Sequence, residues 1–216
     1  MKQFRFRILL AAILLLLLIY PFLEYFSMVE LSLLLNVFTT LILISCVHAV
    51  NDNRHQRIIC IAVIGPAIVL GWGHELTHLN LSLEAATILQ IVAFGIVIYH
   101  LLGYAMRKGH VDGEKIAAAV SVYLLLGVVW QDFYILLDIF ISEPFNTAAL
   151  SRGDFLYFSF ITLSTLGYGD ITPAIGPAQA LAYTEALVGQ LYLTILVARL
   201  VGLYSVDVET EASGDT

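Results

Sequence analysis

Apolar residues gather in six long runs along this chain, separated by short polar or charged connections. A helix needs about 20 apolar residues to cross the ~30 Å hydrocarbon core of a bilayer, and only the third run is somewhat short. The pattern predicts helices over residues 8–26, 31–50, 58–72, 85–105, 116–141 and 176–204. We therefore expect an all-α membrane protein with six transmembrane helices.

The composition supports a membrane protein. Hydrophobic residues make up 60% of the chain and charged residues only 12%, and the mean hydropathy is +0.90. These values lie outside the range of soluble domains. The first apolar run follows basic residues as a signal peptide would, but no small-residue cleavage site follows it, so we keep it as a span. We expect a multi-pass protein of the plasma or inner membrane, surrounded by lipid and without a nucleic acid partner.

The basic residues orient the predicted spans. Cytoplasmic loops carry an excess of Lys and Arg, and a cytoplasmic N-terminus puts nearly all of these residues on one side. Arg152 then lies outside, and Arg199 lies near the inner end of the last span. The residues on the cytoplasmic side are Lys2, Arg5, Arg7, Arg54, Arg57, Arg107, Lys108 and Lys115. Both termini are predicted to be cytoplasmic.

A short aromatic-rich segment, residues 154–164, lies between the last two spans. It begins with Asp154, which suits a helix N-terminus, and it is too short to span. Gly167 and Gly169 follow it, and glycine adopts left-handed backbone at little cost. Irregular backbone is tolerated at membrane depth only where protein buries it or where it borders a water-filled cavity. We therefore expect a re-entrant pore helix followed by an extended loop.

Residues 165–170, Thr-Leu-Gly-Tyr-Gly-Asp, resemble the selectivity filter of potassium channels. In that family, rings of backbone carbonyls replace the hydration shell of the ion. The resemblance covers about residues 113–204 and implies a homotetrameric, potassium-selective channel that is not an enzyme. It also implies no cofactor other than K+ ions in the filter. The filter residues that it implies are Thr165, Leu166, Gly167, Tyr168 and Gly169.

The same resemblance gives roles to residues around the filter. It places Asp170 at the outer mouth and the pore-helix residues Tyr157, Ser159 and Thr162 behind the filter. The phenol of Tyr157 is expected to reach Asp170 and to brace the mouth. The Thr165 hydroxyl is expected to add a ligand at the inner end.

Three positions of the last span are candidates for pore function. Gly189 stands where the inner helix of the family often has a glycine hinge, and a packing surface is the equal alternative because glycine is frequent in transmembrane helices. Thr194 is expected to face the cavity below the filter. Glu185 is an intramembrane carboxylate, which marks it as a functional candidate. We expect it to brace the structure, protonated or bonded to a hydroxyl such as Ser159 or Thr162, rather than to contact ions.

The chain divides into two membrane domains and a tail. Residues 1–110 form a domain of four spans whose role the sequence leaves open. A voltage-sensor domain also has four spans, but its fourth span carries Arg or Lys at every third residue. Residues 85–105 contain neither Arg nor Lys, so the resemblance is limited to the number of spans. We therefore expect no voltage gating. The pore domain, residues 111–206, contains an outer helix at 115–141, a pore helix at 154–164, the filter at 165–170 and an inner helix at 176–204. Residues 207–216 form a short acidic cytoplasmic tail, too short for a covalently linked regulatory domain.

A competing motif lies in residues 74–78, His-Glu-Leu-Thr-His. On a helix this H-E-x-x-H pattern places two imidazoles on one face for zinc, and Asp112 resembles a third-ligand element. However, the predicted topology separates Asp112 from the histidines by ~30 Å, and the Gly-Trp-Gly of residues 71–73 disfavours a helix. We expect loop histidines without structural zinc. The alternatives are an intramembrane zinc metalloprotease and an outer site where protons or metal modulate the channel through His74 and His78.

Overall fold

The computed structural model describes residues 5–26, 31–49, 54–77, 80–107, 111–147 and 149–214. The regular secondary structure of these residues is helical, apart from a single isolated β-bridge, so the all-α prediction is confirmed. The helices are α1 (Arg5–Tyr25), α2 (Leu31–Ala49), α3 (Arg54–Thr77), α4 (Asn80–Ala105), α5 (Gly113–Phe140), α6 (Arg152–Leu163) and α7 (Gly176–Gly214).

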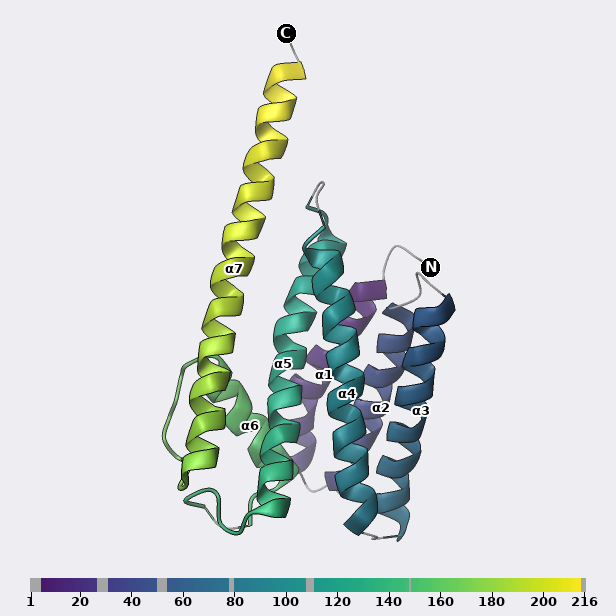
Figure 1. Cartoon of the computed structure of the whole chain (residues 1–216), viewed down its shortest axis with the longest axis vertical. Helices are drawn as coiled ribbons and strands as arrows, with labels where there is room; N and C mark the ends of the chain where they lie inside the picture. Colours follow the sequence, from purple (N-terminus) through teal and green to yellow (C-terminus); the bar gives the residue numbers. More distant parts are fainter. Residues whose placement is uncertain are drawn as a thin grey trace.

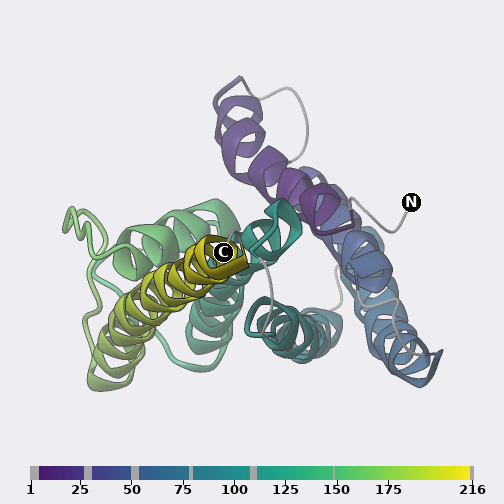
Figure 2. The same cartoon turned by 90° about the horizontal axis from the view of Figure 1, so that it is seen from above.

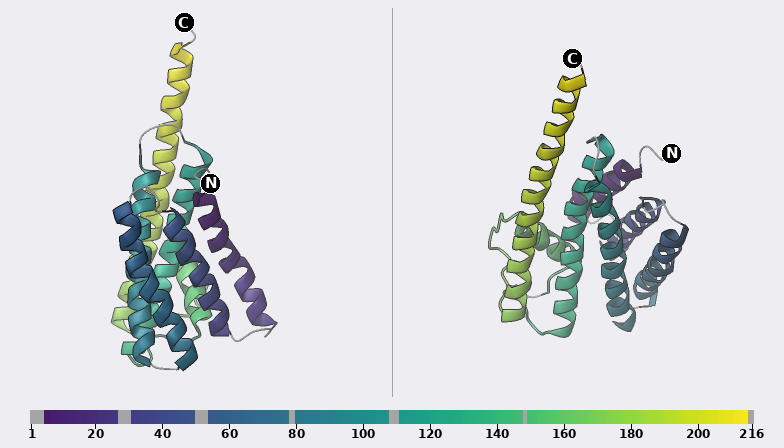
Figure 3. Two further views of the ribbon diagram at one scale, coloured as in Figure 1. Left: turned by 90° about the vertical axis from the view of Figure 1, so that its right-hand side faces the viewer. Right: turned by 45° about the horizontal axis from the view of Figure 1, so that its top comes forward.

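The long helices run up and down along one axis, and both termini lie at the same end of the bundle (Figure 1). The short helix α6 lies near the opposite end and packs on both α5 and α7. Seen from above, α5, α6 and α7 form one group, and α2 and α3 lie on the far side of α1 and α4 (Figure 2). Helix α7 continues to Gly214, and its C-terminal part extends beyond the other helices (Figure 3).

Four helices contain a stretch that is long and apolar enough to cross a membrane. These stretches are Arg5–Leu23, Leu83–Ala105, Gly113–Phe140 and Gly176–Arg199. The apolar stretches described within α2 and α3 are shorter, Asn36–Ser45 and Cys60–Gly73. The structure therefore supports a membrane protein, and crossing by all six long helices remains a prediction.

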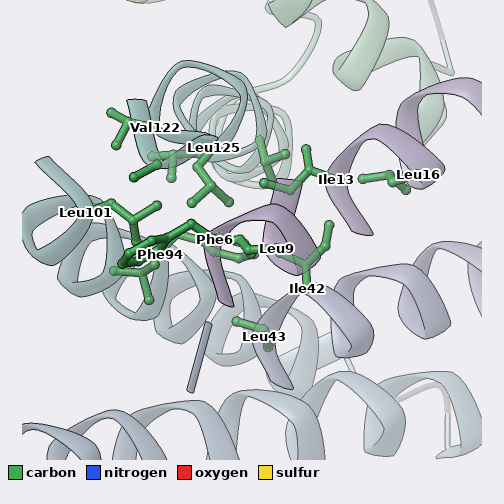
Figure 4. Packing of buried hydrophobic residues seen from close by; sticks show 14 of the residues in the cluster. Phe6, Leu9, Ile13, Leu16, Ile42, Leu43, Phe94, Leu101, Val122 and Leu125 are labelled. Atoms are coloured by element: carbon green, nitrogen blue, oxygen red, sulfur yellow. The ribbon is translucent and has the colours of Figure 1, made fainter. Parts of the chain in front are cut away.

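One face of helix α1 contributes to the apolar core. Its residues Phe6, Leu9 and Ile13 recur every three or four positions, so they share one face of the helix. This face packs against side chains of α2, α4 and α5 (Figure 4). Side chains from these three helices that take part are Ile42, Leu43, Phe94, Leu101, Val122 and Leu125. Of the first four helices, α1 and α4 pack directly on the outer helix α5, whereas α2 and α3 pack mainly on α1 and α4.

Polar contacts at the end of the bundle that holds the termini also join α1 to α5. The Glu114 carboxylate accepts a hydrogen bond from the Phe6 amide at 3.1 Å and pairs with Arg7 at 3.0 Å. At the same end, the Arg199 guanidinium of α7 donates to the Met106 carbonyl at 3.2 Å. The inner helix is thereby attached to the connection between α4 and α5.

The expected end of the third helix is wrong. We expected a loop after residues 71–73, whereas α3 continues through both glycines to Thr77. A glycine in a helix costs only about 1 kcal/mol relative to alanine, and tertiary packing offsets such a cost. Here the Trp72 indole donates to the Thr40 hydroxyl of α2 at 3.0 Å. A methyl group at Gly71 would lie 3.9 Å, an ordinary van der Waals distance, from the side chains of both Asn36 and Gln90, so this glycine lies in the contact of α3 with α2 and α4.

Candidate ion-conducting site

The pore helix α6 begins at a capping box. Ser151 is the N-cap, and its hydroxyl accepts a hydrogen bond from the Asp154 amide at 3.1 Å. The Asp154 carboxylate in turn accepts from the Ser151 amide at 2.8 Å. Such reciprocal bonds satisfy amide groups that the first turn of a helix leaves unpaired. The predicted boundaries of 154–164 are therefore shifted by one or two residues to Arg152–Leu163, and Asp154 is the third helical residue.

The first filter amides turn back onto the C-terminal end of α6. The amides of Leu166 and Gly167 donate to the Ile161 carbonyl at 2.9 and 3.1 Å, and the Thr165 amide donates to the Thr162 carbonyl at 2.9 Å. These bonds use carbonyls that a helix end leaves unpaired. These three amides therefore point toward the helix, and the filter carbonyls accept none of these bonds.

Every second residue of the filter has left-handed backbone. The φ angles are 59° at Thr165, 55° at Gly167 and 81° at Gly169. A Cβ atom would meet no other atom within 4 Å at either glycine, so the conformation and not the available space requires glycine there. At Thr165 the same conformation costs roughly 1–3 kcal/mol, which the surrounding bonds must offset. Strain of this kind, held by its surroundings, is common at functional sites.

The predicted outer mouth is held by two sets of contacts. The Tyr157 hydroxyl donates to the Asp170 carboxylate at 2.7 Å, the contact expected from the sequence. Asn146 lies in the loop between α5 and α6. Its side-chain oxygen accepts a hydrogen bond from the Thr172 backbone amide at 2.7 Å, and its backbone amide donates to the Thr172 carbonyl at 2.9 Å. The chain that leaves the filter is thus fixed to the outer loop.

A buried polar cluster ties α6 to its two neighbouring helices. The Ser159 hydroxyl lies 2.7 Å from the Gly127 carbonyl of α5 and 2.6 Å from a carboxyl oxygen of Glu185 on α7. The Tyr134 hydroxyl of α5 donates to the other carboxyl oxygen at 2.5 Å. Glu185 and Ser159 are both 0% exposed. The acid therefore joins α5, α6 and α7 directly behind the filter.

At the inner end of the filter, α7 contacts the threonine that opens it. The Gln190 side chain donates to the Thr165 hydroxyl at 3.2 Å. Thr194 is exposed in the single chain, and its hydroxyl donates to the Gln190 carbonyl at 2.8 Å. A Cβ atom at Gly189 would meet the Leu163 carbonyl and would lie 2.9 Å from the Leu163 side chain. Gly189 is therefore a close packing point between α7 and α6, and its role as a hinge remains a prediction.

The competing zinc motif lies largely outside the described side chains. His74 and Glu75 fall in the helical part of α3, whereas His78 lies outside the described residues. Asp112 is the N-cap of α5, where it accepts from the Lys115 amide at 2.9 Å. Helix α3 ends at the opposite end of the bundle from the start of α5 (Figure 1). Among the described side chains, no group of three or more His, Cys, Asp and Glu residues is placed to hold a metal ion.

Three contributors to the site were missed by the sequence analysis: Tyr134, Asn146 and Gln190. Each acts from a different element, and none belongs to a local motif. In contrast, the capping box had a readable signal, since Ser151 and Asp154 have the Ser-x-x-Asp spacing of a helix start.

Comparisons with known proteins agree with this site. The sequence profile of a family described as "Ion channel" matches residues 86–205. Protein LctB of Bacillus caldotenax is 36% identical over 97 residues, which are 41% of this chain and 71% of that protein. No solved structure matches the chain.

Two rice proteins (Oryza sativa subsp. japonica) are also similar. Two pore potassium channel c is 41% identical over 56 residues, which are 26% of this chain and 12% of that protein. Two pore potassium channel b is 42% identical over 81 residues, which are 38% of this chain and 22% of that protein. The chain thus spans most of LctB but less than a quarter of each rice protein. Because the family profile covers more than half of the chain, this protein belongs to the ion channel family, and it is similar within that family to potassium channels.

Proposed function

We propose that this protein is a potassium-selective channel that conducts K+ passively and performs no enzymatic reaction. The observation that carries the proposal is the backbone of residues 165–169, in which left-handed and ordinary conformations alternate along a Thr-Leu-Gly-Tyr-Gly sequence. In a regular strand, successive peptides point to opposite sides. A positive φ at every second residue rotates alternate peptides, so that successive carbonyls face one side and offer a row of ligands to a dehydrated cation.

The helix behind the filter supports cation binding. Helix α6 ends at Leu163, immediately before the filter, and a helix carries about half a negative charge at its C-terminal end. The bonds from the filter amides to the Ile161 carbonyl keep this end beside the filter. A cation below the filter is therefore favoured by the helix as well as by the carbonyls.

A homotetramer follows from the single filter sequence in each chain. Residues 164–170 are all exposed in one chain, although carbonyl ligands must surround an ion. Helix α7 also exposes a row of large apolar side chains at intervals of four residues, Tyr183, Leu187 and Leu191, each 60–61% exposed. Four chains around one axis would close the carbonyl rings and cover part of these faces, with lipid on the remainder.

The membrane topology that fits this function has six crossings. Both termini lie at one end of the bundle (Figure 1), and α1 and α3 begin there with Arg5 and Arg54. By the positive-inside rule this end is cytoplasmic, which puts the filter mouth and Asp170 at the outer face.

The first prediction concerns selectivity. The purified protein in liposomes should pass K+ and Rb+ far better than Na+, because the carbonyl rows replace the hydration shell of the larger ions. The reversal potential under a bi-ionic K+/Na+ gradient measures this. Substituting Gly167→Ala should abolish selectivity because alanine is strained at a φ of 55°, whereas Gly202→Ala, which meets nothing within 4 Å on α7, is the matched control. A reversal potential near zero for the unmodified protein would refute the proposal.

The second prediction is that the channel lacks steep voltage dependence. Each elementary charge that crosses the field contributes roughly 2.3 kcal/mol per 100 mV, and α4 offers no Arg or Lys between Asn80 and Ala105. Open probability in symmetrical K+ without cytoplasmic blockers should therefore change only weakly with voltage. A steep sigmoidal curve equivalent to several charges per tetramer would contradict this.

The third prediction tests the brace at the outer mouth. The hydrogen bond from Tyr157 holds the pKa of Asp170 below its usual 3.8, and the same bond raises the pKa of Tyr157 to about 12. Because the pKa of Asp170 is lowered in the folded protein, the brace is present above pH 3.8 and is lost as the pH falls through the lowered value. We expect sustained K+ current to be insensitive to outer acidification down to that range.

Tyr157→Phe should raise the pKa of Asp170 toward 3.8, measured by carboxyl NMR titration, and should shorten sustained openings at neutral pH. Asp170→Asn is the control, because an amide oxygen still accepts from Tyr157 without carrying a charge. If Tyr157→Phe left both the titration of Asp170 and the sustained current unchanged, the hydrogen bond would not brace the filter.

A further inference from the structure

The oxygen atoms around Glu185 are close enough to allow their protons to be counted. Three oxygen–oxygen contacts join Tyr134, Glu185, Ser159 and the Gly127 carbonyl, and they measure 2.5, 2.6 and 2.7 Å. Contacts of this length between oxygen atoms are hydrogen bonds, and each requires one proton between the two atoms. The cluster therefore needs three protons.

Two of the three protons come from the hydroxyl groups. The Gly127 carbonyl accepts only, so the proton in its contact with Ser159 belongs to the serine hydroxyl. The Tyr134 hydroxyl supplies the proton of its own contact with the carboxyl group. The serine has then used its single proton, and the 2.6 Å contact between Ser159 and Glu185 is still without one. The carboxyl group is the remaining donor.

The surroundings agree with a neutral acid. Glu185 is 0% exposed, and none of the described basic side chains pairs with it. A buried carboxylate without a cation is costly, and inside a membrane it is especially so. The titratable groups that face it from α5 are Tyr134, through its hydrogen bond, and Tyr123, and both are phenols. Helix α6 presents only the Ser159 hydroxyl to it.

We infer that Glu185 carries a proton in the native channel and, in that form, is the residue that positions the pore helix between the outer and inner helices. Protonated, it donates to Ser159 and accepts from Tyr134, and Ser159 passes the chain of bonds on to Gly127. Ionised, it would take the serine proton and leave the Gly127 and Ser159 oxygens in contact without one. This inference rests on the proposed channel function only for its effect on conduction, because the protonation state is measurable without ion flow.

Infrared difference spectroscopy of the purified full-length protein tests the proton directly. The spectrum of the unmodified protein at neutral pH, minus that of Glu185→Gln, should contain the carbonyl stretch of a protonated carboxylic acid. Tyr134→Phe should move this band to higher frequency, because the carboxyl oxygen loses one donor. Asp132→Asn is the matched control, since Asp132 is another buried acid, at 2% exposure on α5, and its replacement should leave the Glu185 band in place. A difference spectrum without the acid band would overturn the inference, whether or not the protein conducts K+.

The pattern of rescue tests the positioning role. Glutamine reproduces a donor and an acceptor at the same length, so Glu185→Gln should keep Rb+ flux close to that of the unmodified protein. Aspartate is one methylene shorter and cannot reach both partners, and leucine leaves the Tyr134 hydroxyl unpaired at a cost of about 1–3 kcal/mol. Both should reduce flux about tenfold or more. Size-exclusion chromatography separates loss of the oligomer from loss of conduction. If aspartate preserved flux while glutamine abolished it, an ionised Glu185 would be required and the inference would be wrong.

Discussion

The conformation of the filter depends on the attachment of one short helix. Residues 165–169 leave their carbonyls without a partner in their own chain and hold positive φ at three positions, so they cannot stabilise themselves. The amides of Thr165, Leu166 and Gly167 are bonded to the end of α6. Helix α6 is in turn held to α5 and α7 by the buried acid Glu185, with further hydrogen bonds and an apolar cluster joining it to α5. Displacement of α6 would therefore move the ligands of the proposed ion site. The surrounding polar groups offset the strain at the filter, as expected where strained backbone is functional.

The helices outside the pore unit extend this support. Helix α1 packs apolar side chains against α5, and Glu114 joins the two helices at the end where both termini lie. The Arg199 guanidinium joins the inner helix to the same region through Met106. An outer helix fixed in this way gives α6 and α7 a rigid surface to pack on. The packing of the four leading helices, and the absence of Arg and Lys from α4, fit the proposal that they support the pore rather than sense voltage.

The sequence predicts the existence of the long helices because long apolar runs indicate them, although α7 continues to Gly214 and not only to residue 204. The left-handed backbone at Gly167 and Gly169 is likewise predictable, because glycine adopts it at little cost. That these residues form an ion filter rests on their resemblance to potassium channels and remains a proposal. Prediction from the sequence fails at the end of α3, where the packing of Trp72 and Gly71 against other helices offsets the poor helix propensity of glycine. It also cannot find Tyr134 or Gln190, since their partners lie 51 and 25 residues away and the contacts exist only in the folded chain. Glu185 was found because a carboxyl group inside an apolar span is conspicuous, but its partner on α5 required the structure.

The central claim is that four copies of residues 165–169 surround a line of dehydrated K+ ions. A crystal structure of the protein in lipid with Rb+ or Tl+ in place of K+ tests it most directly, because the anomalous signal locates these ions independently of the protein. Anomalous peaks are expected on the axis of a tetramer, between successive rings of carbonyls from Thr165 to Gly169. An assembly in which these carbonyls face away from a common axis, or in which the axis holds no ion at the filter, would contradict it.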